Sequence, residues 1–202
     1  MLKKVPIAVL CSGGGTNLQA ILDAEAAGNI PSGRVALVVS DNANAFALER
    51  AKKAGVETAV FDRKQVSDRK EREARILALL REKQIGLVIL AGFMTILSEN
   101  FTRAFENRII NVHPSLIPSF CGPGYYGLKV HEAALARGVK VTGATVHYVN
   151  EVCDGGPIIL QKAVNVEEGD TPETLQKRVM REAEWKILPA AAELVCKKLL
   201  QE

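Results

Sequence analysis

Apolar runs alternate with helical patterns through the first half of the chain. Short apolar runs, which predict strands, are separated by longer segments whose apolar residues recur every three or four positions, as they do on one face of a helix. The expected strands are 5–10, 35–39, 57–61, 87–90 and 108–112, and the expected helices are 17–27, 45–54 and 68–83. Strands that are apolar throughout, with helices between them, are typical of βαβ units and a parallel sheet.

The second half of the chain begins with a loop. Residues 113–127 are rich in Pro, Gly, Ser and aromatic residues, a composition that predicts an ordered loop. A helix is then expected over 128–137, because its pattern stops at Gly138. Two apolar segments, 139–149 and 157–166, are separated by a short turn, and this spacing allows an antiparallel pair of strands.

A long helix is expected at the C-terminal end. Thr171 is a good N-terminal capping residue, and Pro172 fits the first helical turn. The helical pattern extends to about Pro189 and resumes through Leu200. These elements together predict an α/β fold: a mostly parallel, Rossmann-like twisted sheet flanked by helices, with an antiparallel C-terminal strand pair and a long C-terminal helix.

Composition restricts the classes of function. A length of 202 residues suits a single domain. Aromatic residues make up only 5% and the net charge is only +3, so no nucleic-acid partner is expected, although small anionic substrates would suit the mild positive balance. The four cysteines form no C-x-x-C pair, which favours neither a zinc site nor disulfides. Residues 1–4 precede an apolar run too short for a signal peptide or a membrane span, so we expect a cytoplasmic protein without a membrane partner.

A glycine-rich turn follows the first expected strand. Three glycines, residues 13–15, stand directly before a helix, whose N-terminus offers free N–H groups and a partial positive charge. Thr16 and Asn17 add side-chain donors, so the turn suits a phosphate group. A dinucleotide fingerprint fails because Leu18 occupies its third glycine position, and the P-loop lysine is missing. A tight strand-to-helix turn without a ligand is the open alternative.

Asn111 and His113 stand two positions apart at the end of the fifth expected strand, where alternation places them on one face. An amide and a protonated imidazole can stabilise the oxyanion of an acyl transfer, and the imidazole can pass a proton to the leaving nitrogen. Asp154 is the best candidate for a carboxylate that favours the protonated imidazole. Asp154 could instead belong only to a β-turn, and His113 could be a hydrogen-bonded residue before a proline turn.

The other two histidines carry weaker signals. His131 falls in a helical pattern and is expected at the surface. His147 alternates with Thr145 in an expected strand, so it either faces the same site as Asn111 or packs internally. No carboxylate stands at ligand spacing from the histidines, so no metal site is expected.

Four segments follow the glycine turn in a characteristic order. They are residues 90–97, 111–118, 143–147 and 154–158. In this order and spacing they resemble the glycinamide ribonucleotide formyltransferase family of purine synthesis, and the resemblance covers nearly the whole chain. It implies that the formyl group of 10-formyltetrahydrofolate is transferred to the amine of 5′-phosphoribosylglycinamide. Within one domain over 1–202, residues 1–107 would form the phosphate-binding half and 108–202 the catalytic and folate-binding half.

The resemblance also implies roles for individual residues. The chemistry would be carried by Asn111, His113 and Asp154. The ribonucleotide would be bound by Gly15, Thr16, Asn17 and Glu184. The formyl donor would be contacted by Arg69, Met94, Thr95, Ile96, Leu97, Asn111, Asn150, Glu151, Val152, Cys153 and Asp154. The chain departs from the family pattern at Thr95, where many relatives carry Arg, at Trp185, where His is common, and in a longer loop over 119–126.

Three other functions are open. Methionyl-tRNA formyltransferase and formyltetrahydrofolate hydrolase resemble the catalytic half, but each carries an additional domain for which we expect no room in this chain. A dinucleotide-binding protein could use Asp41 to bind a ribose, although the missing third glycine counts against it. A non-catalytic ligand-binding relative is disfavoured by the complete set of Asn111, His113 and Asp154. The sequence allows a homodimer without predicting one.

Overall fold

A seven-stranded sheet runs through the structure, a computed structural model that describes residues 4–202. Residues 1–3, part of the segment judged too short for a signal peptide, lie outside the described residues. The strands are β1 (Val5–Cys11), β2 (Gly33–Ser40), β3 (Glu57–Val60), β4 (Leu87–Leu90), β5 (Ile109–His113), β6 (Val141–Tyr148) and β7 (Ile158–Asn165). Their order in the sheet is β3-β2-β1-β4-β5-β6-β7.

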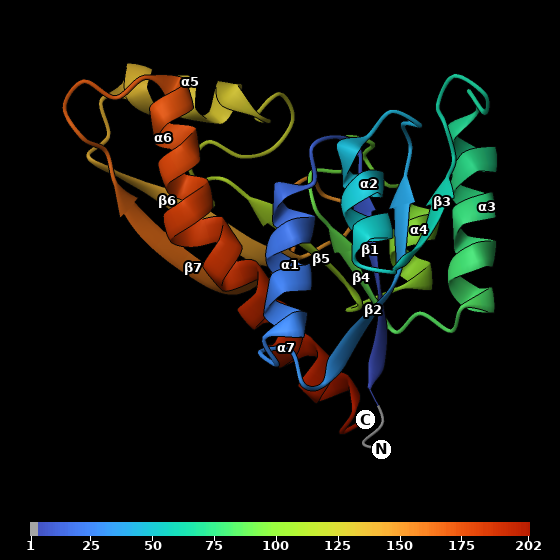
Figure 1. The fold of residues 1–202 in the computed structure, drawn as a ribbon. Coiled ribbons are helices and arrows are strands. Elements are labelled where there is room, and N and C mark those ends of the chain that lie inside the picture. The colour runs from blue at the N-terminus through green and yellow to red at the C-terminus, as the bar shows by residue number, and fades with distance from the viewer. Residues whose placement is uncertain (1–3) are drawn as a thin grey trace.

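Strands β1 to β5 run parallel, whereas β6 pairs antiparallel with both β5 and β7 (Figure 1). The helices are α1 (Thr16–Ala26), α2 (Phe46–Lys53), α3 (Arg69–Glu82), α4 (Glu99–Ala104), α5 (Leu128–Arg137), α6 (Pro172–Val179) and α7 (Trp185–Leu199). This arrangement confirms the predicted fold class, including the antiparallel C-terminal strands and the long C-terminal helix.

Both faces of the central strands of the sheet are buried. Alternate residues of β1 belong to opposite hydrophobic cores: Ile7 and Val9 pack with residues of α1, α2, α6 and α7, whereas Ala8 and Leu10 pack with residues of α3 and α4. Figure 1 shows α3 and α4 on the opposite side of the sheet from α1 and α6. Burial on both faces is the reason why these strands are apolar throughout. No helix within residues 4–202 combines the length and the apolar character needed to cross a bilayer.

Two details of the helices differ from the sequence prediction. Helix α4 was not predicted, since it is only six residues long, although Ser98 caps its N-terminus by accepting a hydrogen bond from Phe101 N. The expected interruption near Pro189 was also wrong, because α7 continues through that residue. The irregularity lies earlier, in a π-helical turn over Met180–Glu184 that joins α6 to α7.

Candidate active site

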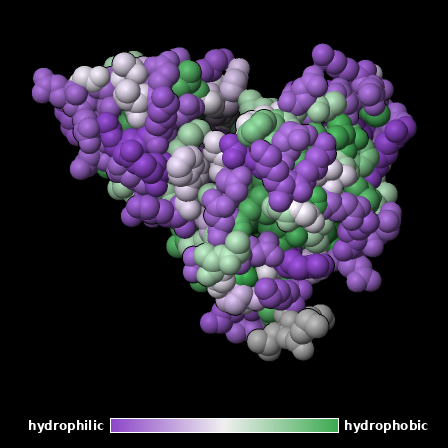
Figure 2. Space-filling view, viewed as in Figure 1, coloured by the Kyte–Doolittle hydropathy of each residue, from purple (hydrophilic) through white to green (hydrophobic). Residues whose placement is uncertain are grey.

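The candidate site lies at the carboxyl ends of the parallel strands. Figure 2 shows that a notch at this end separates a mostly hydrophilic lobe, which contains α5 and α6, from the lobe of α2 and α3. The fifth strand brings Asn111 and His113 to this edge, and antiparallel pairing sets His147 of β6 directly opposite Asn111. His147 therefore faces the site, which settles the alternative that the sequence left open.

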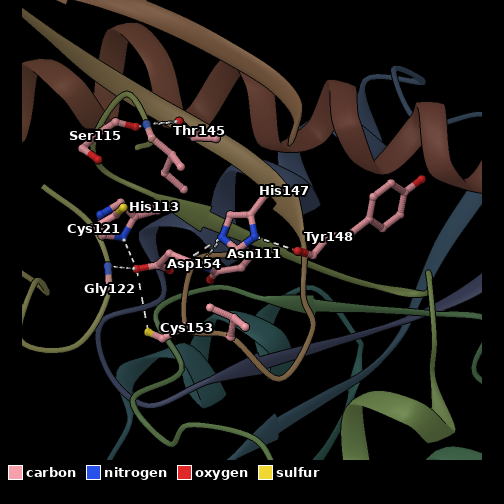
Figure 3. A network of polar contacts seen from close by, with 12 residues as sticks. Asn111, His113, Ser115, Cys121, Gly122, Thr145, His147, Tyr148, Cys153 and Asp154 are labelled. Carbon is pink, nitrogen blue, oxygen red and sulfur yellow. Dashed lines mark hydrogen bonds and ion pairs between the residues drawn. The ribbon is translucent and has the colours of Figure 1, made fainter. Parts of the chain in front are cut away.

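The carboxylate of Asp154 lies close to both His113 and His147 (Figure 3). Its Oδ2 lies 3.5 Å from His113 Nδ1, and its Oδ1 lies 3.6 Å from His147 Nε2. The backbone N–H of Gly122 also donates to Asp154 Oδ2, at 2.9 Å. The structure thus brings together the three residues that the sequence predicted as catalytic, and it adds His147 and the Gly122 amide.

The surroundings of Asp154 favour its carboxylate form. Burial alone would raise the pKa of its carboxyl, but the hydrogen bond with His147, the charge of His113 and the Gly122 amide together hold that pKa below the ordinary value of 3.8. His113 Nε2 donates to the carbonyl of Phe120 at 2.9 Å. Because the other ring nitrogen of His113 faces a carboxylate, both neighbours of this ring are acceptors, and the arrangement suits an imidazolium.

The backbone around Asp154 is tightly constrained. Asp154 has a φ of 54°, in the left-handed region that few residues other than glycine adopt. Two residues later, a Cβ added to Gly156 would lie 1.8 Å from the carbonyl oxygen of Tyr148. This turn therefore packs against the end of β6 and fixes Asp154 beside His147, which goes beyond the simple β-turn that the sequence allowed.

The loop after His113 is anchored to the antiparallel strands. Thr145 Oγ1 donates to the carbonyl of Ser115 at 2.7 Å and accepts from the amide of Ile117 at 3.1 Å. Gln161 Nε2 donates to the carbonyl of Ile117 at 3.0 Å. These contacts hold the chain immediately after His113, so the imidazole is presented from a rigid frame.

Two adjoining cavities open beside these residues. The larger, of about 550 Å³, is lined by both Asn111 and His113, and the smaller, of about 120 Å³, by Asn111 and the 149–154 segment. They share Phe93, Met94, Ile96, Asn111, Cys153 and Asp154. Every residue that was predicted to contact the formyl donor, except Arg69, lines the smaller cavity. Its apolar side chains, together with the polar side chains of Asn111, His147 and Asp154, suit a flat heterocycle with polar edges.

Arg69 does not line either of these cavities; it lies at the start of α3, 3.8 Å from Glu73. That Arg69 contacts the formyl donor stays a prediction.

Arg63, which the sequence did not single out, lines the larger cavity. Its Nε lies 3.4 Å from Asp41 Oδ2, which also accepts a hydrogen bond from Thr95 at 2.7 Å. Asp41 is only 1% exposed, so its carboxylate is not accessible to a ribose as the dinucleotide alternative requires.

The glycine turn lies next to this site. Ser12 Oγ accepts a hydrogen bond from the amide of Met94 at 2.9 Å, which ties the turn to the wall of both cavities. Gly15, in the left-handed region with a φ of 71°, caps α1. Among residues 4–202, none accepts a hydrogen bond from the amides of residues 13–16. These donors at a helix N-terminus suit an anion.

Asn17 and Glu184 meet on the other side of the glycine turn. Asn17 Nδ2 donates to Glu184 Oε2 at 2.6 Å. Burial raises the pKa of the Glu184 carboxyl to about 7, although the hydrogen bond from Asn17 acts in the opposite direction. The π-helical turn carries Glu184 to this position, and such turns occur frequently at functional sites.

His131 contradicts the expectation of a surface residue. Its side chain is fully buried on the inner face of α5, and neither ring nitrogen has a hydrogen-bond partner among the described residues. Burial, together with the charge of the neighbouring His113, lowers the pKa of His131 to about 4. The helical pattern predicted the element correctly but not its buried face, to which Val130, His131 and Ala134 belong.

Comparisons with known proteins agree with this geometry. A family model described as "Formyl transferase" matches residues 5–192. The chain is 44% identical over 183 residues to a phosphoribosylglycinamide formyltransferase of Haemophilus influenzae, covering 91% of this chain and 83% of that protein. It is also 45% identical over 199 residues to the human trifunctional purine biosynthetic protein adenosine-3, covering 98% of this chain. It spans only 19% of the length of that trifunctional relative.

Solved structures give the same result. The glycinamide ribonucleotide transformylase 1 of Symbiobacterium toebii superposes with a TM-score of 0.90 at 45% identity, covering 98% of this chain and 90% of that one. A phosphoribosylglycinamide formyltransferase of Bacillus halodurans superposes with a TM-score of 0.86 at 39% identity, covering 94% of both chains. The chain therefore belongs to the formyl transferase family and, within it, to the phosphoribosylglycinamide formyltransferases.

Proposed function

We propose that the chain transfers the formyl group of 10-formyltetrahydrofolate to the amine of 5′-phosphoribosylglycinamide. The observation that carries the proposal is the convergence of Asn111, His113 and Asp154 between a cavity that suits a flat heterocycle and a glycine turn that suits a phosphate. We expect this activity in the cytoplasm, without a metal ion and without nucleic-acid or membrane partners; a homodimer is compatible with it.

Asn111 and His113 act on the oxygen of the formyl group. Attack of the substrate amine on the formyl carbon moves negative charge to that oxygen, and preorganised donors stabilise it. The side-chain nitrogen of Asn111 carries two hydrogens and lies 3.3 Å from His147 Nε2, which keeps the amide at the site with a hydrogen available for the oxygen. The imidazolium of His113 supplies positive charge. As the carbon–nitrogen bond to the folate breaks, its Nε2–H turns from the Phe120 carbonyl to protonate the leaving nitrogen, and the proton released by the attacking amine restores the imidazolium.

Asp154 and His147 position these groups. The carboxylate of Asp154 favours the charged form of His113, and its contact with His147 holds both rings on one side of the site. His147 Nδ1 donates to the carbonyl of Tyr148 at 2.7 Å, which fixes the ring and leaves Nε2 toward Asn111 and Asp154. Asp154 thereby links the orientation of Asn111 to the charge of His113.

The two substrates bind on opposite sides of Met94. The smaller cavity takes the pterin ring of the donor through apolar side chains of 90–97 and backbone groups of 150–154. The amides of 13–16 take the phosphate of the acceptor, and Asn17 with Glu184 takes its ribose. Because Ser12 bonds the amide of Met94, the two binding sites share one wall, which sets the distance between amine and formyl group.

The test is an assay of tetrahydrofolate release from 10-formyltetrahydrofolate, with and without the ribonucleotide. We expect release that depends on the ribonucleotide and that disappears in His113→Ala, while Lys52→Met, an exposed change on α2, retains full activity. Release that ignores the ribonucleotide would indicate a hydrolase instead. No release under either condition would contradict the proposal.

A further inference from the structure

Helix α2 is attached to the glycine turn by two hydrogen bonds and to helix α1 by a third. The amide of Ala47 donates to the carbonyl of Gly13 at 3.1 Å. Arg50 Nε donates to the carbonyl of Gly14 at 2.8 Å, and Arg50 Nη1 donates to Gln19 Oε1 at 3.0 Å. One guanidinium therefore bridges the turn and the first helix that follows it.

These contacts decide where the amides of the turn point. In a planar trans peptide the carbonyl and the N–H of one unit point in opposite directions. Since the carbonyls of Gly13 and Gly14 face α2, the N–H groups of Gly14 and Gly15 point away from it. A Cβ added to Gly13 or Gly14 would meet no atom within 4 Å, so the turn is open to a ligand.

The Arg50 side chain is itself held in place. Its guanidinium lies over the ring of Phe46, 5.0 Å from the centroid. The partner of Arg50, Gln19, is oriented by its own hydrogen bond from Nε2 to Asp23 Oδ1, at 2.8 Å. A planar guanidinium can reach both the Gly14 carbonyl and Gln19, whereas a lysine ammonium has one nitrogen and lacks this fixed fork.

We propose that Arg50 is a positioning residue for the substrate phosphate: it holds the carbonyl of Gly14 so that the amides of the turn are directed toward the bound anion. This role rests on the proposed function, which assigns the phosphate to the turn. Arg50 contacts the carbonyl side of the turn, opposite the amide of Gly15, so this role requires no direct contact with the substrate.

The main experiment compares Arg50→Met with the wild type. Methionine retains most of the apolar stem and removes both hydrogen bonds. Because misdirected amides of the turn bind the phosphate less well, we expect KM for the ribonucleotide to rise about tenfold, which corresponds to about 1.4 kcal/mol of binding free energy. We expect kcat and KM for the folate to change less than about twofold, since Arg50 contacts Gly14 and not Ser12, the residue of the turn that bonds Met94. The matched control is Lys52→Met on the same helix, where the Lys52 ammonium forms an exposed ion pair with Glu49.

Inorganic phosphate gives a readout that does not depend on turnover. We expect phosphate to bind Arg50→Met about tenfold more weakly than the wild type by calorimetry, because the same amides receive it. We expect Arg50→Lys to resemble Arg50→Met more than the wild type. Thermal melting of each variant reports whether the fold is intact.

The proposal is overturned by an unchanged KM and an unchanged phosphate affinity in Arg50→Met. It is also overturned if kcat falls and both KM values rise by similar factors while Tm drops by a large amount, because that pattern would indicate a general structural role. Full recovery in Arg50→Lys would overturn it as well, because charge alone would then suffice. If the wild type ignores the ribonucleotide, the proposed function fails, while phosphate binding still tests the role of Arg50.

Discussion

Asn17 and Glu184 are separated by 167 positions in the sequence and are joined by a hydrogen bond of 2.6 Å. Asn17 belongs to the first turn of the first helix, and Glu184 ends the π-helical turn near the C-terminus. The pair therefore joins the two ends of the chain at the side of the site that we propose binds the ribonucleotide. The buried carboxyl of Glu184 predicts a specific dependence of stability on pH.

Stability is expected to depend on the ionisation of Glu184. Its folded-state pKa, about 7, is above the ordinary value of 4.5, so the folded protein binds the proton more tightly than the unfolded chain. The free energy of unfolding should therefore fall between pH 4.5 and 7, by at most on the order of 3 kcal/mol. Urea unfolding at pH 5, 6, 7 and 8 measures this, and Glu184→Gln should lack that fall. If the free energy of unfolding of the wild type and of Glu184→Gln changed with pH in the same way, Glu184 would not be the group responsible.

Asp154→Asn should lower turnover far more than ribonucleotide affinity. The amide loses the negative charge that favours the imidazolium of His113, while the glycine turn is left intact. We expect kcat to fall about 100-fold or more, with the dissociation constant of the ribonucleotide changed less than about threefold. Steady-state kinetics and calorimetry give the two quantities, and an unchanged kcat would remove Asp154 from the mechanism.

His131 should remain neutral throughout the physiological range. Its pKa, about 4 in the folded state, is below the ordinary value of 6.5, so the unfolded chain binds the proton more tightly and stability is lost as pH falls from about 6.5 toward 4. NMR of the ring protons should show no titration of His131 between pH 5.5 and 8. His131→Leu provides the resonance assignment, and a midpoint near 6.5 would show that the ring is not buried as described.

Gly156→Ala should displace the turn that carries Asp154. The new Cβ would meet the carbonyl of Tyr148 at 1.8 Å, so the backbone has to move. We expect kcat to fall at least about tenfold, because misplacement of a group by about 1 Å is enough for large losses. Gly169→Ala, in an exposed turn with a φ of 81°, is the control that introduces strain elsewhere. Equal activity in both variants would show that the turn tolerates the shift.

The sequence predicted most of the fold because the spacing of apolar residues along a strand or helix indicates which of its faces is buried. Strands buried on both faces and the helices between them were recognised from apolar spacing alone. Helix α4 was missed because six residues carry too little of the helical period. The π-helical turn was missed because its extra residue per turn leaves no distinctive composition.

The candidate site was predictable where side chains act, and less so where the backbone acts. Asn111, His113 and Asp154 were identified by residue type and position, and family resemblance added Glu184. The contact of Gly122 with Asp154 comes from a backbone amide, which every residue except proline carries, so sequence offers no signal for it. His131 was misplaced because a short amphipathic pattern does not say which polar residue faces the core.

The π-helical turn makes the position of Glu184 sensitive to chain length. Its five residues take the place of a more tightly wound segment, so deletion of one residue between Val179 and Trp185 would convert the turn to regular α-helix. Each residue of an α-helix turns the chain by about 100°, so α6 would be rotated relative to α7 by roughly that angle. Either Leu175 and Val179 would leave the core, or Glu184 would leave Asn17. The position of the Glu184 carboxyl beside Asn17 thus depends on the number of residues in this segment as well as on their identities.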